Sequence, residues 1–284
     1  MSLYGFLLVL AAAFSHATWN FFVKRINAGP ELVWLFSAIS VLPYSPLAVY
    51  FLWITPGFGM QDYGLIAVSA ILHLGYFLLL QAGYRKGELS LIYPLARATG
   101  PLLSTGLAVL VLNEPFAVQT GIGAAVIVTG VLMLTGGIRA PRHGAGISLA
   151  FGLGAGLLIG GYTVWDAHAV SVAAIPPLLL DYASSVGRSL LLAPIAARRR
   201  AKIGEIWRDH KAGVLAIAVF NPLAYILVLV ALTFTPIVYV APIREVSVIL
   251  TVLAGSLFLG EGELKHRLVW ATVIFAGVAL LATS

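Results

Sequence analysis

The sequence of 284 residues contains no cysteine, which excludes disulfide bridges, thiolate metal sites and iron–sulfur clusters. Charged residues are also scarce: they make up 10% of the chain, whereas a soluble globular protein has about 25%. Hydrophobic residues reach 60% and the mean hydropathy is +0.99, so too little polar surface remains for a fold in water. The composition therefore predicts an all-α integral membrane protein.

Sequence patterns of intramembrane enzymes are missing as well. Transferases that use Mg²⁺ need clustered acids, because Mg²⁺ takes oxygen ligands, yet the acids in the apolar segments are isolated. No HxxxH or DxxxD pair occurs, and no G-x-S-x-G turn marks a serine nucleophile. We therefore predict a protein that is not an enzyme and that holds neither a metal nor a cofactor.

Ten apolar runs are each close to the length of about 20 residues that a spanning helix needs. They cover residues 4–23, 32–54, 63–84, 89–112, 116–137, 145–168, 173–197, 212–233, 237–260 and 268–283. The only substantial polar connection between them is Arg198–Lys211, which we predict to be a loop. No Lys or Arg precedes Lys24, so the basic start of a signal peptide is missing and the first helix is expected to be retained.

Lys and Arg residues are confined to alternate connections. Of the 17 in the chain, 14 lie in the first, third, fifth, seventh and ninth connections, and none lies in the even connections or at the termini. Short cytoplasmic loops accumulate these residues, so the pattern predicts an inner-membrane protein with both termini periplasmic. Because topology explains the net charge of +6, we expect the lipid bilayer and no nucleic acid as a partner.

The two halves of the chain resemble each other. Three matches recur at offsets of 146 to 149 residues: Tyr93–Arg97 with Tyr239–Arg244, Thr18–Asn20 with Val164–Asp166, and Tyr76–Leu78 with Tyr225–Leu227. Five helices in each half is an odd number, so the second half must enter the membrane in the opposite orientation. The sequence predicts two inverted five-helix repeats, 1–138 and 145–284, around a central cavity, an arrangement typical of secondary transporters.

Prolines occupy equivalent positions in segments 4 and 9. Pro94 lies three residues before Arg97, and Pro242 lies two residues before Arg244. A proline removes a backbone donor and clashes with the preceding turn. Interrupted helices at matching positions of two repeats point to a transporter's binding site. We therefore predict that both segments are interrupted, with simple helix kinks as the alternative.

Aromatic and polar residues share helix faces at spacings of three or four residues. We predict that the following residues line the substrate path: His73, Tyr76, Tyr93, Trp165, Trp19 and Tyr225. For Trp19 and Trp165, anchoring at the membrane interface is an alternative. A histidine that only packs and hydrogen-bonds is the alternative for His73.

Several ionisable groups lie within apolar segments, where charge is costly. Arg97 and Arg244 could hold a substrate carboxylate, form a gate between the halves or stabilise their own helices. His16 and Asn20 share a face and are placed with the gating or structural residues. Asp181 and Arg188, seven residues apart, are predicted to form an internal ion pair or a water-bridged pair.

These motifs resemble the drug/metabolite transporter superfamily, and specifically its EamA-type exporters. The resemblance rests on the ten segments and on Pro94-x-x-Arg97 with Asn113-Glu114-Pro115, echoed by Pro242-x-Arg244 with Gly260-Glu261. It implies that helices 1–4 and 6–9 surround a central cavity and that helices 5 and 10 lie at the periphery. The ring-rich faces are closest in character to the aromatic amino-acid exporter branch.

The sequence thus predicts a monomeric secondary transporter that exports small neutral or zwitterionic metabolites, in particular aromatic or other apolar amino acids, by alternating access. Carriers of nucleotide-sugars, drugs or lipids are the alternatives within transport, and an intramembrane enzyme is a more distant one. The first segment lacks the membrane glutamate of small multidrug-resistance proteins. His16, His73 and Asp181 are left as candidate proton carriers, but a hydrogen bond to the substrate explains His73 as well and Arg188 is the expected partner of Asp181, so the prediction is uncoupled, facilitated movement.

Overall fold

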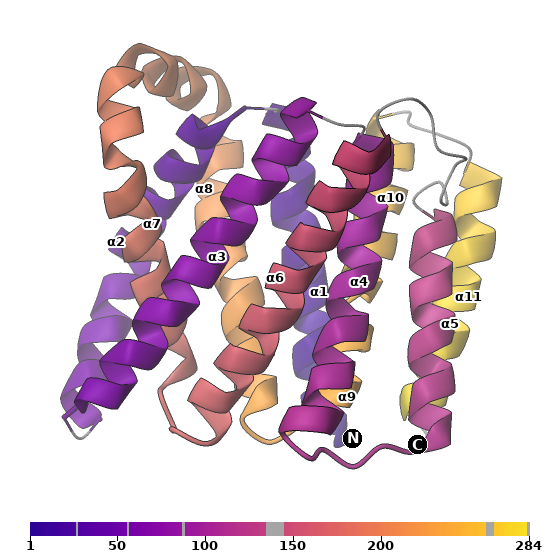
Figure 1. Cartoon of the computed structure of the whole chain (residues 1–284). Helices are drawn as coiled ribbons and strands as arrows, with labels where there is room; N and C mark the ends of the chain where they lie inside the picture. Colours follow the sequence, from indigo (N-terminus) through magenta and orange to yellow (C-terminus); the bar gives the residue numbers. More distant parts are fainter. Residues whose placement is uncertain (27, 56, 87–88, 135–144, 260–263, 283–284) are drawn as a thin grey trace.

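The computed structural model describes all residues except 27, 56, 87–88, 135–144, 260–263 and 283–284. The secondary structure of the described residues is entirely helical. The helices are α1 (Leu3–Ile26), α2 (Pro30–Ile54), α3 (Met60–Lys86), α4 (Leu89–Val111), α5 (Val118–Leu134), α6 (Ala145–Ser171), α7 (Pro177–Arg198), α8 (Arg200–Leu232), α9 (Ile237–Ile243), α10 (Val246–Leu259) and α11 (Leu264–Ala282). Figure 1 shows them as an upright bundle.

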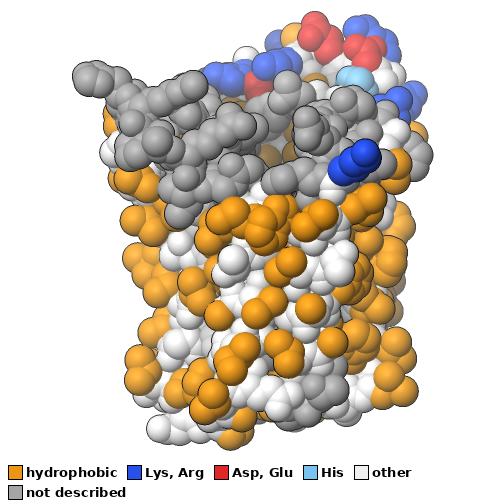
Figure 2. Space-filling model, turned by 90° about the vertical axis from the view of Figure 1, so that its right-hand side faces the viewer, with side chains coloured by type: hydrophobic (Ala, Val, Ile, Leu, Met, Phe, Trp, Pro, Cys, Tyr) orange, Lys and Arg blue, Asp and Glu red, His pale blue; other side chains and the backbone are white. Residues whose placement is uncertain are grey.

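The helices follow the ten predicted segments, and α9 and α10 together form the ninth. By length and composition α1, α2, α3, α6 and α8 could each cross a membrane, and shorter apolar helices lie in α4, α5 and α11. Large hydrophobic side chains such as Leu42, Trp53 and Leu110 are exposed on the outside of the bundle. On the face in Figure 2, hydrophobic side chains cover the body, and charged side chains gather at one end. The all-helical membrane fold is confirmed.

The packing of the helices repeats between the halves. Contacts of α1 with α8 are mirrored by contacts of α6 with α3, and contacts of α4 with α6 by those of α10 with α1. The pairs α2 with α7 and α5 with α11 join equivalent helices directly. In Figure 1, α1 rises from the end where the N-terminus lies and α6 descends toward it. The arrangement is that of two inverted repeats, with α5 and α11 at one edge.

The connection Arg198–Lys211 differs from its prediction as a loop. Residues from Arg200 onward form the start of α8, which bends at His210, where φ is −134° and ψ is 29°. Ile203, Ile206 and Trp207 recur at helical spacing and pack against the cluster around Leu32. The predicted loop is therefore an amphipathic helix, because this apolar face has a partner.

Ion pairs also connect the N-terminal end of α8 to α2. The Glu31 carboxylate is buried and lies 2.7 Å from Arg199 and 3.7 Å from Lys202. Both cations are half exposed, so this contact adds only modestly to stability.

The structure also differs from the prediction that segments 4 and 9 are both interrupted. Segment 9 is interrupted at Arg244–Glu245, between α9 and α10, whereas α4 is continuous through Pro94 and Pro101. The prediction was therefore right for segment 9 and wrong for segment 4. Close packing of α4 along α6 explains the continuity: a Cβ atom on Gly100 would lie 2.5 Å from Cγ2 of Ile159. Ile159 thus packs directly against α4 one residue before Pro101.

Candidate functional site

A carboxylate with two side-chain partners lies at the meeting point of α3, α6 and α8. Nε2 of His73 is 2.9 Å from Oδ2 of Asp166, and the hydroxyl of Tyr225 donates to the same oxygen at 2.5 Å. Asp166 is fully buried, and its other oxygen, Oδ1, has no hydrogen-bond partner among the described residues. A buried acceptor without a partner is costly, so this oxygen is available to a ligand.

Aromatic rings surround this carboxylate. The His73 ring stacks on Tyr162 with 4.1 Å between centroids and meets Tyr225 edge-on at 4.9 Å. Tyr76 contacts Tyr162 with 5.9 Å between centroids. We call His73, Tyr76, Tyr162, Asp166 and Tyr225 the Asp166 cluster. It combines one acid with a wall of rings, which suits a ligand that has an apolar body and a polar end.

Helical spacing explains why these residues meet. Tyr162 and Asp166 are four residues apart on α6, and His73 and Tyr76 are three apart on α3, so each pair shares a face. The contacts of α6 with α3 and α8 then bring the two faces and Tyr225 together.

Arg97 joins the two halves. Its Nη2 lies 2.9 Å from Oε2 of Glu245 and donates to Oγ of Ser247 at 3.2 Å. All three side chains are buried. Arg97 comes from the first repeat and both partners come from the second, so the charge of Arg97 is neutralised by a contact between repeats.

Arg244 is placed differently from its counterpart Arg97. It lies at the interruption after α9, is 5% exposed, and its Nε has no hydrogen-bond partner. Within the described part of the chain, no ion pair or side-chain hydrogen bond engages its guanidinium. Arg244 is within electrostatic range of Tyr162 and Tyr225, so a cation lies near the Asp166 cluster.

The remaining predicted residues lie outside the cluster. Nε1 of Trp19 donates to Nδ1 of His16 at 3.3 Å, and Asn20 donates to the carbonyl of His16 at 2.8 Å, so the predicted face of α1 bonds within itself. Trp165 donates from Nε1 to the carbonyl of Leu65 at 2.9 Å.

The two prolines and Tyr93 complete the predicted set. Pro242 is buried near the end of α9, and its carbonyl accepts the N–H of Glu245 at 3.0 Å. Tyr93 and Pro94 belong to α4, but their side chains lie outside the described residues.

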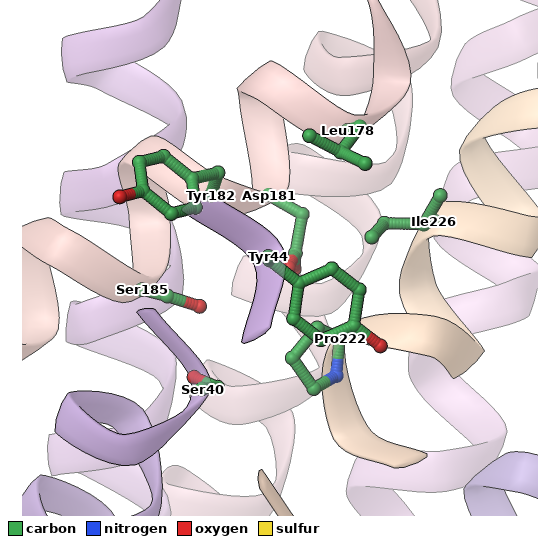
Figure 3. A pocket seen from close by; sticks show the side chains of 8 residues that line it. All are labelled: Ser40, Tyr44, Leu178, Asp181, Tyr182, Ser185, Pro222 and Ile226. Atoms are coloured by element: carbon green, nitrogen blue, oxygen red, sulfur yellow. The ribbon is translucent and has the colours of Figure 1, made fainter. Parts of the chain in front are cut away.

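Asp181 and Arg188 do not form the predicted ion pair. Seven helical residues separate them by about 10 Å along the axis. Arg188 instead donates to Oγ of Ser185 at 3.0 Å and lies over the Phe77 ring, 5.4 Å from its centroid. Asp181 lines a small pocket between α2, α7 and α8, with Tyr44 and Tyr182 close by (Figure 3).

Sequence reasoning missed two members of the Asp166 cluster as site residues. Tyr162 and Asp166 were not among the residues predicted to line the substrate path, and Asp166 was not named among the ionisable groups of the apolar segments. The available signal was the position of Asp166 inside an apolar segment and opposite Asn20 in the repeat. Its contact with His73 spans 93 residues, which no local pattern predicts.

An inverted bundle of this kind, with an interrupted helix and buried charges near its centre, defines the class of multi-pass membrane transporters. The profile of the EamA-like transporter family matches residues 3–136 and again residues 146–283. The chain belongs to the EamA-like transporter family, whose members carry small molecules across membranes.

Two further comparisons bear on the fold. Among solved structures, 29 chains match. One, titled only as the crystal structure of a protein, has a TM-score of 0.79 and 14% identity, covering 98% of this chain and 96% of that chain. This likeness supports the fold alone. A comparison with curated proteins found no match.

Proposed function

We propose that this transporter exports small zwitterionic metabolites, in particular aromatic or other apolar amino acids, by alternating access. The observation that carries the proposal is the presence of two buried, opposite charges near the same rings: Asp166 with an unpartnered oxygen, and Arg244 without an ion pair among the described residues. A carboxylate suits an ammonium group, and a guanidinium suits a carboxylate. The rings of Tyr76, Tyr162 and Tyr225 suit an apolar side chain.

Each predicted residue then has a proposed role. His73, Tyr76, Tyr162, Asp166 and Tyr225 contact the substrate, and Arg244 holds its carboxylate. Tyr93, Trp165 and Trp19 are proposed for other parts of the substrate path, and Arg97, Pro94, Pro242, His16 and Asn20 for gating or support. Arg97 is the strongest gating candidate, because its contact with Glu245 must rearrange if the repeats move relative to each other.

The Arg97–Glu245 contact also argues against a carrier of phosphorylated substrates. Such a substrate brings two or more negative charges and is held by several cations. Because Glu245 neutralises Arg97, Arg244 is, among the described residues, the arginine without an ion pair that lies near the rings of the cluster. A zwitterion fits this charge balance better than a nucleotide-sugar does.

The proposed setting is the inner membrane, with both termini periplasmic and one chain as the working unit. The confinement of Lys and Arg to alternate connections supports the orientation. The halves 1–138 and 145–284 supply cluster residues on α3 and on α6 and α8, respectively, so a single chain contains the whole site.

Exchange of radiolabelled substrate in proteoliposomes tests the proposal. Vesicles loaded with unlabelled L-phenylalanine should accumulate labelled L-phenylalanine at equal pH on both sides. Phenethylamine, which lacks the carboxylate, and 3-phenylpropionate, which lacks the amine, should compete at least tenfold more weakly, since a lost charged hydrogen bond costs about 1.5–3 kcal/mol. Preferred exchange of phenethylamine would instead favour export of cationic amines, which is the drug-carrier alternative.

Two variants assign the ends of the substrate. Asp166→Asn should lose exchange of L-phenylalanine, and Arg244→Gln should lose it while keeping a weak exchange of labelled phenethylamine. His168→Gln, on the same helix as Asp166 but outside the cluster, is the control and should exchange normally. Wild-type exchange by Asp166→Asn and Arg244→Gln would place the substrate elsewhere.

A further inference from the structure

We propose that the His73–Asp166 pair is the proton-coupling site of this transporter, so that each outward-moving substrate molecule is exchanged for one proton moving inward. The inference rests on the proposed function, because the same Asp166 carboxylate serves the substrate amine and the proton. It replaces the facilitated, uncoupled movement that the sequence favours.

Burial of Asp166 is the first step of the argument. A carboxylate removed from water stays ionised only if a cation neutralises it, and otherwise it binds a proton itself. Among the described residues, the only group within hydrogen-bond distance that can carry a positive charge is His73, at 2.9 Å. The other contact, from the hydroxyl of Tyr225, is neutral. In the empty site a proton therefore stays with the pair, on the imidazole or on the carboxylate.

Imidazole suits this task because histidine is the side chain that gains and loses a proton between about pH 5 and 8. Stacking on Tyr162 and the edge contact with Tyr225 fix the plane of the His73 ring and direct Nε2 at Asp166. The cation is thereby held at Oδ2, while Oδ1 of the same carboxylate is left for a substrate ammonium, so the two cations compete for a single negative charge.

The other charged and titratable groups around the pair do not replace His73 as the partner of Asp166. They are Tyr76 on α3, Tyr162 on α6, Tyr225 on α8, Arg97 on α4, Glu245 and Arg244 beyond α9, Asp181 and Arg188 on α7, and His16 on α1. Arg97 is neutralised by Glu245, and Arg188 on α7 donates to Ser185 and lies over the Phe77 ring, away from the pair. Arg244 makes no ion pair with Asp166, and the proposed function assigns it to the substrate carboxylate.

Exchange follows from competition for Asp166. In the empty state, imidazolium and carboxylate are paired. When a substrate ammonium binds at Oδ1 and neutralises the carboxylate, the imidazolium loses its compensating charge, and one N–H proton passes to water while the bonding electron pair stays on the ring nitrogen. No other bond breaks. The neutral imidazole regains a proton only after the ammonium leaves, so proton and substrate occupy the site alternately.

Proteoliposomes containing a pH-sensitive dye in the lumen test the inference. The vesicles are loaded with L-phenylalanine, the membrane voltage is clamped with potassium and valinomycin, and the vesicles are diluted into substrate-free medium at the same pH. We expect the lumen to acidify as substrate leaves, with about one proton entering for each substrate molecule. A protonophore should abolish the acidification, and vesicles loaded with 3-phenylpropionate should show none.

The variants separate coupling from structure. His73→Gln keeps a hydrogen-bond donor beside Asp166 but cannot carry a proton, so the protons moved per substrate should fall at least tenfold, whatever flux remains. Tyr225→Phe removes the neutral contact and should change the flux without changing this ratio. His168→Gln serves as the matched histidine control and should resemble wild type.

Two negative results have different meanings. Exchange of L-phenylalanine at equal pH together with a constant luminal pH during net efflux would overturn the coupling and leave the proposed function intact. A wild-type ratio in His73→Gln would also overturn it. Failure of all amino-acid exchange by wild-type protein would overturn the proposed function, and the coupling with it.

Discussion

Replacing Gly100 by alanine should weaken the interface between α4 and α6, on which the geometry of the site depends. A Cβ atom at this position would lie 2.5 Å from Cγ2 and 2.9 Å from Cβ of Ile159. Ile159 is fully buried, and its branched Cβ leaves it essentially one rotamer in a helix. The clash therefore cannot be relieved by side-chain rotation, and the two helices must separate.

The size of the effect follows from overpacking. Adding a methyl group to a well-packed core costs about 1–3 kcal/mol. The helix preference of alanine over glycine offsets up to about 1 kcal/mol of this cost. We therefore expect a net loss of about 1–2 kcal/mol. Because α4 carries Arg97 and α6 carries Asp166, separation of the helices should lower transport as well.

Thermal unfolding of purified protein in detergent measures the first effect, and substrate exchange in vesicles measures the second. Gly106→Ala is the matched control: it lies on the same helix, and no atom lies within 4 Å of its added Cβ. This variant should be as stable as wild type or more stable. The reasoning would be refuted if Gly100→Ala unfolded at the same temperature as Gly106→Ala.

Three further predictions concern the ends of the bundle and the contact between repeats. Glu114 accepts the N–H groups of Ile237 and Val238 at 2.9 and 3.0 Å. Glu114→Gln keeps one acceptor oxygen and should lose about 1.5–3 kcal/mol of stability, unlike exposed Glu205→Gln, and equal melting would contradict this. Arg97→Gln and Glu245→Gln should each lose transport and stability, with the double variant losing less than their sum, whereas strict additivity would show that the pair is uncoupled. A C-terminal phosphatase fusion should be active and a fluorescent-protein fusion dark, and the opposite result would reverse the proposed topology.

The sequence predicts the spans and their inverted pairing well, because both depend on local properties. Apolar length marks each helix, and an odd number of helices per half forces the inversion. The sequence did not predict the amphipathic start of α8, because most of its residues are polar. Its apolar face is buried only by packing against the cluster around Leu32 on α2, which the sequence of α8 does not reveal. Continuity of α4 across Pro101 depends on glycine contacts with α6, which helix preferences do not encode.

The sequence predicts several residues of the candidate site, but it does not predict which of them contact each other. His73, Tyr76 and Tyr225 were predicted to line the substrate path, and the structure brings His73 and Tyr225 to Asp166 and Tyr76 to the adjacent Tyr162 ring. The same reasoning paired Asp181 with Arg188, which lie on one helix but do not meet, because a contact within a helix is easier to propose than one across 93 residues. Long-range packing decides which acid a histidine meets.

The two repeats differ in the residue that follows each intramembrane arginine, and this difference decides which arginine has an acidic partner. Arg97 and Arg244 are equivalent, but Glu245 follows Arg244 where Ala98 follows Arg97. Among the described residues Glu245 pairs with Arg97, and no acid lies within ion-pair distance of Arg244. Ala98→Glu would restore the symmetry by supplying a partner for Arg244 across the contact of α4 with α9.

In Ala98→Glu the new carboxylate would pair with the guanidinium of Arg244, which is proposed to hold the substrate carboxylate. Exchange of L-phenylalanine should therefore fall at least tenfold. Ala98 is buried, so Ala98→Gln, of nearly equal size, measures the cost of packing alone. Ala98→Glu should bind substrate more weakly than Ala98→Gln while unfolding at a similar or higher temperature, since an ion pair replaces an unpaired buried cation. Equal substrate exchange by both variants would mean that Arg244 does not hold the substrate.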